Sequence, residues 1–268
     1  MALKDITLGQ YFPGSSPIHR LDPRVKLVVL VLYIAALFLA SGWQTYLLTF
    51  LALAGAVAAS TVKPRALLKG MKPVLFLLVF TAILNMFYTP GRALFHFWIF
   101  TMTYEGVVRA FFMVARILML ISATFLLTYT TSPLALTGGL EHLLSPLKKI
   151  RFPVHELAMI MSIALRFIPT LIEETDKIMS AQRARGADFD TGNLVQKAKA
   201  LIPLLVPLFI SALRRAEELA TAMECRCYHG GEGRTRMKQL RCRPADWLFL
   251  AGALALCAAV GVLARFGW

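Results

Sequence analysis

The sequence predicts an all-α integral membrane protein with about five transmembrane helices and a cytoplasmic module of three further helices. Its 268 residues are 57% hydrophobic, above the roughly 45–50% that is typical of soluble domains, and only 16% are charged. Five apolar runs approach the length that a helix needs to cross a bilayer. Residues 153–228 are instead amphipathic and rich in charge. This stretch must lie in water or against a partner, because ions are costly to bury in lipid.

The expected spans are residues 25–40, 43–59, 73–87, 106–129 and 247–266. Ser41 and Gly42 separate the first two spans, which are expected to form a helical hairpin. A basic loop is expected at residues 63–72, and the short aromatic segment 94–100 suits the membrane interface. The N-terminal residues have no apolar core preceded by basic residues, so a cleaved signal peptide is not expected.

The distribution of Lys and Arg predicts the orientation, because short cytoplasmic loops are enriched in both. Four basic residues occur up to residue 26, four more occur in the loop at 63–72, and none occurs between the first two spans. Residues 131–244 hold 17 basic and 11 acidic side chains, a net charge of +6. We therefore expect a multi-pass protein of the cell membrane, with a cytoplasmic N-terminus and the long charged region on the same side.

Proline and glycine divide this region into three expected helices, at residues 133–150, 154–185 and 193–228. Apolar residues recur at steps of three and four along the last two, which predicts one apolar seam on each. The seams are Leu157, Met161, Ala164, Ile168 and Leu171, and then Ile202, Val206, Phe209, Leu213, Ala216, Ala220 and Met223. The two helices are expected to pack on each other or to share a partner, and ordinary core packing is the alternative. The predicted domains are 1–130, with the first four spans, 131–245, the cytoplasmic module, and 246–268, the last span.

No segment predicts catalysis or nucleotide binding. The glycine groups at 186–192 and 230–233 lack the Gly-x-x-x-x-Gly-Lys-Ser/Thr pattern that holds phosphates, and no helix carries a zinc-protease spacing. No serine lies in a nucleophile elbow. We expect no enzymatic activity and no cofactor bound by this chain. If ATP drives the protein, a partner binds it.

Two of the expected helices end in tripeptides centred on arginine. These are Ala184, Arg185 and Gly186, and Cys225, Arg226 and Cys227. A guanidinium carries five donors in a fixed fork, which suits carboxylates and carbonyls in a groove of another protein. The alternative is that each arginine only offsets the negative end of its helix. Two copies, each ending a long amphipathic helix, favour docking.

The run at residues 9–26, Gly-Gln-Tyr-Phe-Pro-Gly-Ser-Ser-Pro-Ile-His-Arg-Leu-Asp-Pro-Arg-Val-Lys, resembles the opening signature of a known family. This is the transmembrane T component of energy-coupling factor (ECF) transporters, an EcfT/CbiQ-like family, and the order of spans and long helices is similar over nearly the whole chain. The signature residues, expected to be structural, are Pro13, Gly14, His19, Asp22, Pro23 and Arg24.

The resemblance implies that Arg185 and Arg226 dock into two cytosolic ABC-type ATPase subunits, which use ATP and Mg. It also implies that three coupling helices cradle a separate substrate-binding membrane subunit, the S component, which is reoriented to release a vitamin or metal ion. The residues assigned to that contact are Ile202, Pro203, Val206, Pro207 and Phe209. The kinked apolar stretch around the two prolines is expected at the inner membrane surface or under this partner.

The second tripeptide departs from the family pattern, which has small residues such as Ala and Gly at the two cysteine positions. The missing glycine at Cys227 argues against a left-handed helix end there, which Gly230 or Gly231 could supply instead. A zinc site is disfavoured, because standard sites separate paired cysteines by two to four residues. Its candidate ligands would be Cys225, Cys227, His229 and Cys242, and no bound metal is expected.

Charged residues at the membrane carry two further expectations. Arg116, near the middle of the fourth span, is expected to be satisfied by helix carbonyls, with pairing to Glu105 or Asn85, or contact with the S component, as alternatives. His19, Asp22 and Arg24 are expected to form a polar cluster that fixes the first helix.

Other functions remain open from sequence. The chain could be the T component of a cobalt/nickel-type importer, or a self-sufficient secondary transporter or channel. A nucleic-acid partner is not expected, because acidic residues are interspersed with the basic ones of the charged region. The transported substrate, the choice of S component and the stoichiometry are not encoded in a chain that leaves recognition to another polypeptide.

Overall fold

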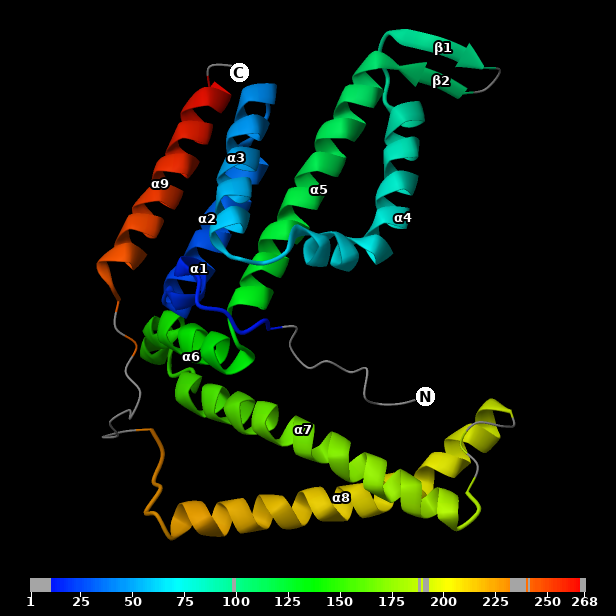
Figure 1. Cartoon of the computed structure of the whole chain (residues 1–268), viewed down its shortest axis with the longest axis vertical. Helices are drawn as coiled ribbons and strands as arrows, with labels where there is room; N and C mark the ends of the chain where they lie inside the picture. Colours follow the sequence, from blue (N-terminus) through cyan, green and yellow to red (C-terminus); the bar gives the residue numbers. More distant parts are fainter. Residues whose placement is uncertain are drawn as a thin grey trace. The chain divides into compact units, whose positions relative to one another are not determined.

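The computed structural model describes residues 11–97, 100–187, 189, 193–231, 240 and 242–265. In chain order the elements are α1 (Pro17–Arg20), α2 (Pro23–Leu39), α3 (Trp43–Ala59), α4 (Pro64–Tyr88), β1 (Ala93–Phe97), β2 (Phe100–Thr103), α5 (Tyr104–Thr130), α6 (Pro133–Leu143), the 3₁₀ helix η2 (Ser145–Ile150), α7 (Val154–Ala184), α8 (Leu194–Glu224) and α9 (Pro244–Arg265) (Figure 1). The predicted all-α membrane fold is confirmed. Within the described residues, one antiparallel two-stranded hairpin, β1–β2, is its single departure.

Contacts divide the chain into two compact units. The membrane unit comprises residues 9–142 and 240–268, and the α7–α8 unit comprises residues 1–8 and 143–239. Helix α6, apart from its last residue, falls in the membrane unit. The domain boundaries at 130/131 and 245/246 remain predictions.

Several helices of the described residues suit a bilayer. Helices α4, α5, α7 and α9 are long and apolar enough to cross one. Helices α2 and α3 have 17 residues each, about 25 Å at 1.5 Å per residue, which is the short end of the spanning range. The second half of α7 carries Glu173, Glu174 and Asp176, so α7 remains predicted as a cytoplasmic helix.

Packing in the membrane unit centres on α5, which contacts α4, α2 and α3, while α9 packs mainly on α2. Leu37 of α2 and Val260 of α9 are fully buried, together with Thr45 and Thr49 of α3. Large apolar side chains such as Phe38, Phe50 and Phe76 point outward and are exposed, as expected for helices that face hydrocarbon.

The prediction of a basic loop at residues 63–72 is wrong, because α4 begins at Pro64 and continues through Pro73. Proline is favoured in the first turn of a helix, where its missing N–H needs no partner. Inside the helix, Pro73 removes a hydrogen bond and clashes with the preceding turn, and Figure 1 shows α4 bending within its length. The basic side chains Arg65, Lys69 and Lys72 therefore project from a helix, and all three are exposed.

Two other elements differ in detail from expectation. The single helix expected at 133–150 is divided at Leu144 into α6 and η2, and the left-handed Arg151 (φ 61°) ends η2. The segment at 94–100 contributes to the β hairpin, while its place at the membrane interface remains a prediction. The expected helices at 154–185 and 193–228 are confirmed as α7 and α8.

Candidate docking site

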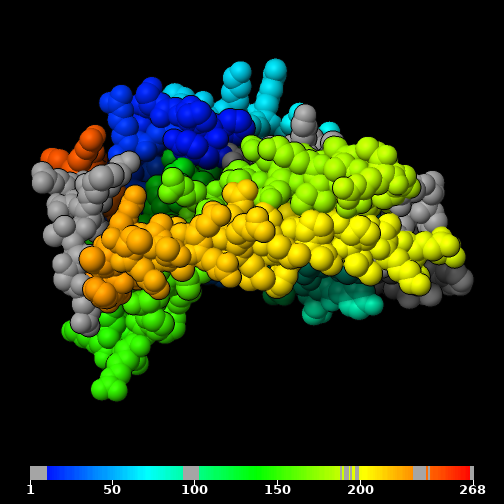
Figure 2. All heavy atoms as spheres, turned by 90° about the horizontal axis from the view of Figure 1, so that it is seen from below, coloured from blue at the N-terminus to red at the C-terminus, as the bar shows by residue number. Residues whose placement is uncertain are grey.

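Helices α7 and α8 lie side by side as an antiparallel pair (Figure 2). Leu204 of α8 is only 6% exposed. The Glu174 carboxylate of α7 accepts hydrogen bonds from the Ser211 hydroxyl and from Arg215 Nη2, the latter at 2.9 Å. The Ser211 bond, with the positive charge of Arg215, lowers the pKa of Glu174 below its usual value. An ionised carboxylate therefore helps to hold the two helices together.

The predicted apolar seam of α8 does not face α7. Ile202, Val206, Phe209 and Leu213 are 55%, 52%, 65% and 49% exposed. Because an α-helix turns about 100° per residue, these four positions lie on the side of α8 opposite Leu204. The prediction that this seam packs on α7 is therefore wrong. The interior prolines Pro203 and Pro207 are also exposed, so α8 presents a broad apolar surface that nothing in the described part of the chain covers.

The α7 end carrying the first tripeptide is a Schellman motif. Gly186 has φ +88°, its N–H donates to the Arg183 carbonyl at 3.0 Å, and the Ala187 N–H donates to the Gln182 carbonyl at 3.0 Å. Only glycine adopts this left-handed conformation without strain. A Cβ added at Gly186 would meet nothing within 4 Å, so the backbone angle, not crowding within the chain, favours glycine here.

The α8 end carrying the second tripeptide has the same hydrogen-bond pattern. The Cys227 N–H donates to the Glu224 carbonyl at 2.8 Å, and the Tyr228 N–H donates to the Met223 carbonyl at 3.1 Å. Cys227 itself is left-handed, with φ +54°. The expectation that Gly230 or Gly231 would replace a left-handed end at Cys227 is therefore wrong, although Gly230 also has a positive φ, of +99°.

The two tripeptides thus present arginine in the same local setting. Arg185 directly follows α7, which ends at Ala184, and Arg226 lies two residues beyond α8, which ends at Glu224; each arginine directly precedes a left-handed residue. All six residues of the tripeptides are exposed. Because α7 and α8 run antiparallel, the two arginine ends lie at opposite ends of the helix pair (Figure 1).

Part of the N-terminal signature forms a turn around His19. The ring Nε2–H donates to the Phe12 carbonyl at 3.0 Å, and the Ser16 hydroxyl lies 2.6 Å from Nδ1. A Cβ added at Gly14 would lie 2.9 Å from the His19 ring, so this close approach requires glycine. Pro13 lies in the same turn and is exposed.

The rest of the signature connects the start of α2 to the start of α9. The Asp22 carboxylate caps α2 by accepting from the Arg24 N–H at 2.9 Å, and Pro23 follows it in the first turn. The Asp22 N–H donates to Asp246 Oδ1 at 2.9 Å, and Arg24 Nη2 donates to the Leu240 carbonyl at 3.4 Å. His19 therefore bonds separately from the Asp22 and Arg24 group, and the signature residues do not form a single cluster.

Two residues of this region were missed by sequence reasoning. Asp246 is 2% exposed and accepts from both Asp22 and Arg243. Lys26 is 7% exposed, and its ammonium donates to the Thr130 carbonyl at 2.9 Å and to Thr131 Oγ1 at 3.0 Å. The sequence signals that could have identified them were an Asp in the first turn of the last helix and a Lys inside an apolar run.

Arg116 donates to a backbone carbonyl, as the structural interpretation predicted, although its buried Nε has no hydrogen-bond partner. Its Nη2 donates to the Ala40 carbonyl at 3.0 Å, just beyond the end of α2, and its guanidinium lies 5.7 Å from the ring centroids of both Phe38 and Tyr46. The alternative pairings are wrong. Glu105 accepts from the Arg92 N–H, and the Asn85 amide donates to the Thr81 carbonyl.

Comparison with known proteins gives one consistent result. The model of the cobalt transport protein family, CbiQ, matches residues 14–237. The energy-coupling factor transporter transmembrane protein EcfT of Ruminiclostridium cellulolyticum is 54% identical over 239 residues, covering 89% of this chain and 90% of that protein. The EcfT proteins of Thermosediminibacter oceani and Bacillus subtilis are 50% and 48% identical, covering 99% and 96% of this chain and 100% and 97% of their own lengths.

Proposed function

The chain belongs to the CbiQ family of cobalt transport proteins, as a transmembrane component of the energy-coupling factor type, and we propose that it couples two cytosolic ABC-type ATPase subunits to a substrate-binding S component. The complex would import vitamins or other micronutrients across the cell membrane. The chain itself would be non-catalytic and bind no cofactor, while ATP and Mg would be used by the ATPase subunits.

One observation carries the proposal: the two arginine ends share one backbone geometry and lie at opposite ends of the α7–α8 pair. A repeated exposed motif suits a pair of similar partners, one at each end. The guanidinium of Arg185 or Arg226 would enter a groove on one ATPase subunit and donate to carboxylates or carbonyls there.

The α7–α8 pair is suited to transmitting movement. Each helix has 31 residues and is about 46 Å long at 1.5 Å per residue. When ATP draws the ATPase subunits together, the arginine ends would be displaced with them, and the two long helices would carry that displacement to the S component. Such coupling requires that the arginines contact the ATPase subunits differently in the two nucleotide states.

The exposed apolar face of α8 is the proposed contact for the S component. It contains Ile202, Pro203, Val206, Pro207 and Phe209. Exposed apolar surface of this extent is typical of an interaction site. A membrane-embedded partner with an apolar surface would cover it, and changes on this face should spare the binding of the ATPase subunits.

Charge reversal at the two arginine ends tests the proposal. Arg185→Glu and Arg226→Glu should each weaken co-purification of the ATPase subunits, and the double variant should abolish uptake while membrane insertion stays normal. Arg214→Glu is the matched control, since Arg214 is an exposed arginine within α8 and not at its end. Normal uptake by the double variant would reject the docking role. Uptake by the purified chain alone in liposomes would instead favour a self-sufficient transporter.

The match to the cobalt transport protein family favours a second candidate, the T component of a cobalt/nickel-type importer. Mass spectrometry of the subunits that co-purify in mild detergent, with uptake of cobalt and of vitamins measured in parallel, separates the two. A metal-specific S component and metal uptake would support this candidate against vitamin import.

A further inference from the structure

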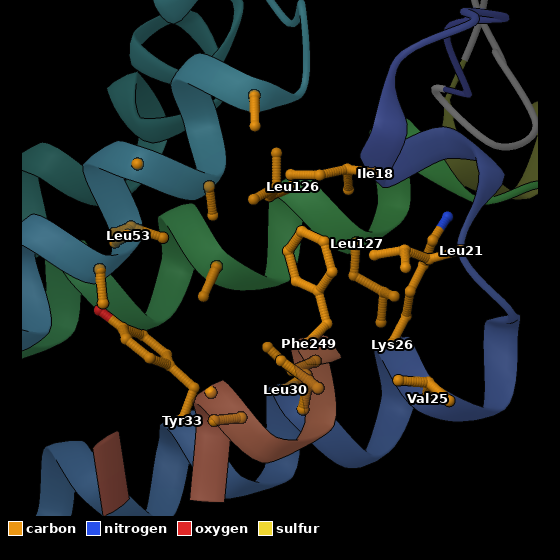
Figure 3. Close-up of a pocket in the computed structure, with 18 of the residues that line it drawn as sticks. Ile18, Leu21, Val25, Lys26, Leu30, Tyr33, Leu53, Leu126, Leu127 and Phe249 are labelled. Carbon is orange, nitrogen blue, oxygen red and sulfur yellow. The ribbon is translucent and has the colours of Figure 1, made fainter. Parts of the chain in front are cut away.

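A cavity of about 440 Å³ lies inside the membrane unit, between α2, α3, α5 and α9. Figure 3 shows side chains from all four helices around it: Leu30 and Tyr33 of α2, Leu53 of α3, Leu126 and Leu127 of α5, and Phe249 of α9. The wall is almost entirely hydrocarbon. Its volume is within the 300–1,000 Å³ that is typical of ligand pockets.

The polar groups at the wall are already engaged by the protein. The Lys26 ammonium donates to the Thr130 carbonyl and the Thr131 hydroxyl, and the Tyr33 hydroxyl donates to the Thr49 carbonyl at 3.2 Å. A buried water needs two to four polar partners, and an apolar cavity that lacks them stays dry. The cavity therefore suits neither water nor a polar ligand.

The cavity opens between α3 and α9. Ala52 and Gly55 of α3 and Leu248 and Gly252 of α9 line it and are also exposed at the surface. A Cβ added at Gly55 or at Gly252 would meet nothing within 4 Å, so these glycines leave space instead of allowing close helix packing.

The surface around this opening is apolar, as expected of a surface that faces hydrocarbon. Next to it, the outward side chains of the same two helices are apolar and exposed: Phe50 and Leu51 on α3 are 55% and 58% exposed, and Leu254 on α9 is 51% exposed. An empty apolar void would forfeit the dispersion contacts of its lining. A hydrocarbon chain from the surrounding solvent would restore them.

We propose that the acyl chain of a bilayer lipid enters between α3 and α9 and fills this cavity, completing the core of the membrane unit. The lipid is recognised by its hydrocarbon chain. Among the described residues that line the cavity, Lys26 is the cation, and because it already donates to protein oxygens, the lining does not select an anionic head group. This inference concerns the membrane unit alone and does not depend on the proposed docking of ATPase subunits.

A photocrosslinking experiment tests the site. The full-length chain is placed in nanodiscs of palmitoyl-oleoyl phosphatidylcholine that contain phosphatidylcholine with a diazirine near the end of one acyl chain, and labelled residues are mapped by mass spectrometry. Label should reach the half-buried wall residues Leu30 and Leu127 as well as outward residues. Label confined to outward positions such as Leu254 and Val262 would overturn the proposal.

Cavity-filling variants provide the matched comparison. Gly55→Leu and Gly252→Leu should reduce label at Leu30 and Leu127 several-fold, whereas Gly261→Leu, on α9 but away from the cavity, should leave it unchanged. Two variants on different helices guard against one that fails to fold, which elution of a single monodisperse species checks. Undiminished label in both filled variants would contradict the proposal. Repetition with co-purified partner subunits gives a further outcome: loss of the inner label would show that a partner's side chain, not lipid, occupies the cavity.

Discussion

The two arginine ends form the same structure from different residues. At the end of α7, glycine occupies the left-handed position after Arg185, and at the end of α8, Cys227 does so. Both ends satisfy their last carbonyls with the same pair of hydrogen bonds. The difference teaches that this backbone geometry does not require glycine, although an L-residue in a left-handed conformation costs roughly 1–2 kcal/mol.

The strain at Cys227 has a consequence for the proposed function. In the proposed docking role, the strained left-handed Cys227 would serve to position Arg226. We therefore expect the two ends to respond differently to changes at the left-handed residue and similarly to changes at the arginine.

The largest effect is expected from replacing the guanidinium and keeping the charge. Arg185→Lys and Arg226→Lys preserve the interaction with the helix dipole but lose the planar fork, so each should weaken binding of the ATPase subunits by about 1.5–3 kcal/mol, the value of a charge-assisted hydrogen bond. Titration of purified ATPase subunits against the reconstituted chain measures this. Unchanged affinity for both lysine variants would support the alternative in which the arginines only offset the helix dipole.

Substitutions at the left-handed residue should change the stability of the helix end in opposite directions at the two ends. Gly186→Val should destabilise the end of α7 by about 1–2 kcal/mol, because a β-branched residue strongly disfavours a positive φ. Cys227→Gly should stabilise the end of α8 by about 0.5–1 kcal/mol, since relief of strain exceeds the added flexibility of the unfolded chain. Hydrogen exchange at Ala187 and Tyr228, whose N–H groups close the two motifs, reports each change, and a loss of protection at Tyr228 in Cys227→Gly would refute the strain argument.

Thiol modification should affect one end only. Cys225 and Cys227 are free and exposed beside Arg226, whereas the first tripeptide has no cysteine. Reaction with N-ethylmaleimide should therefore add bulk at the α8 end and weaken binding of one ATPase subunit. The Cys225→Ser/Cys227→Ser double variant is the control and should bind normally after treatment. Equal losses with and without the two cysteines would show that the reagent acts elsewhere.

The smallest effect is expected from pH. Glu174 helps to join α7 to α8, and its pKa is lowered in the folded chain, so its contribution to stability is present above the ordinary Glu value and is lost as pH falls through the lowered pKa. Partial exposure keeps the contribution small. Glu174→Gln should flatten the acid side of the stability profile, measured by chemical denaturation. A profile identical to that of the unmodified chain would remove this carboxylate from the account.

Much of the fold was predictable because hydropathy and helix-end residues determine it locally. The predicted spans and the two long helices at 154–185 and 193–228 correspond to observed helices to within a few residues, except at α4. There the basic residues at 63–72 indicated a loop, but Pro64 starts a helix, and long Lys and Arg side chains can project from a helix as readily as from a loop.

The geometry of the candidate site was less predictable from the sequence than its local patterns. Periodicity identified the apolar seam of α8 but not what it faces, because a 3.6-residue repeat does not distinguish a neighbouring helix from a missing partner. The left-handed Cys227 contradicts its own residue preference, and hydrogen bonds at the helix end decide its conformation. Asp246 and Lys26 form hydrogen bonds with residues that are distant in the sequence, Asp22 and Thr130, so local sequence patterns could not predict these contacts.

Site-specific crosslinking from the two arginine ends tests the central claim most directly. A photoreactive residue is placed at position 187, beside the first end, and at position 228, beside the second, in the chain purified with its co-expressed partners. The account predicts that each probe captures a cytosolic ATPase subunit, and that both crosslinking yields change when ATP is added. If both probes crosslink only to this chain, with and without ATP, the coupling function is contradicted.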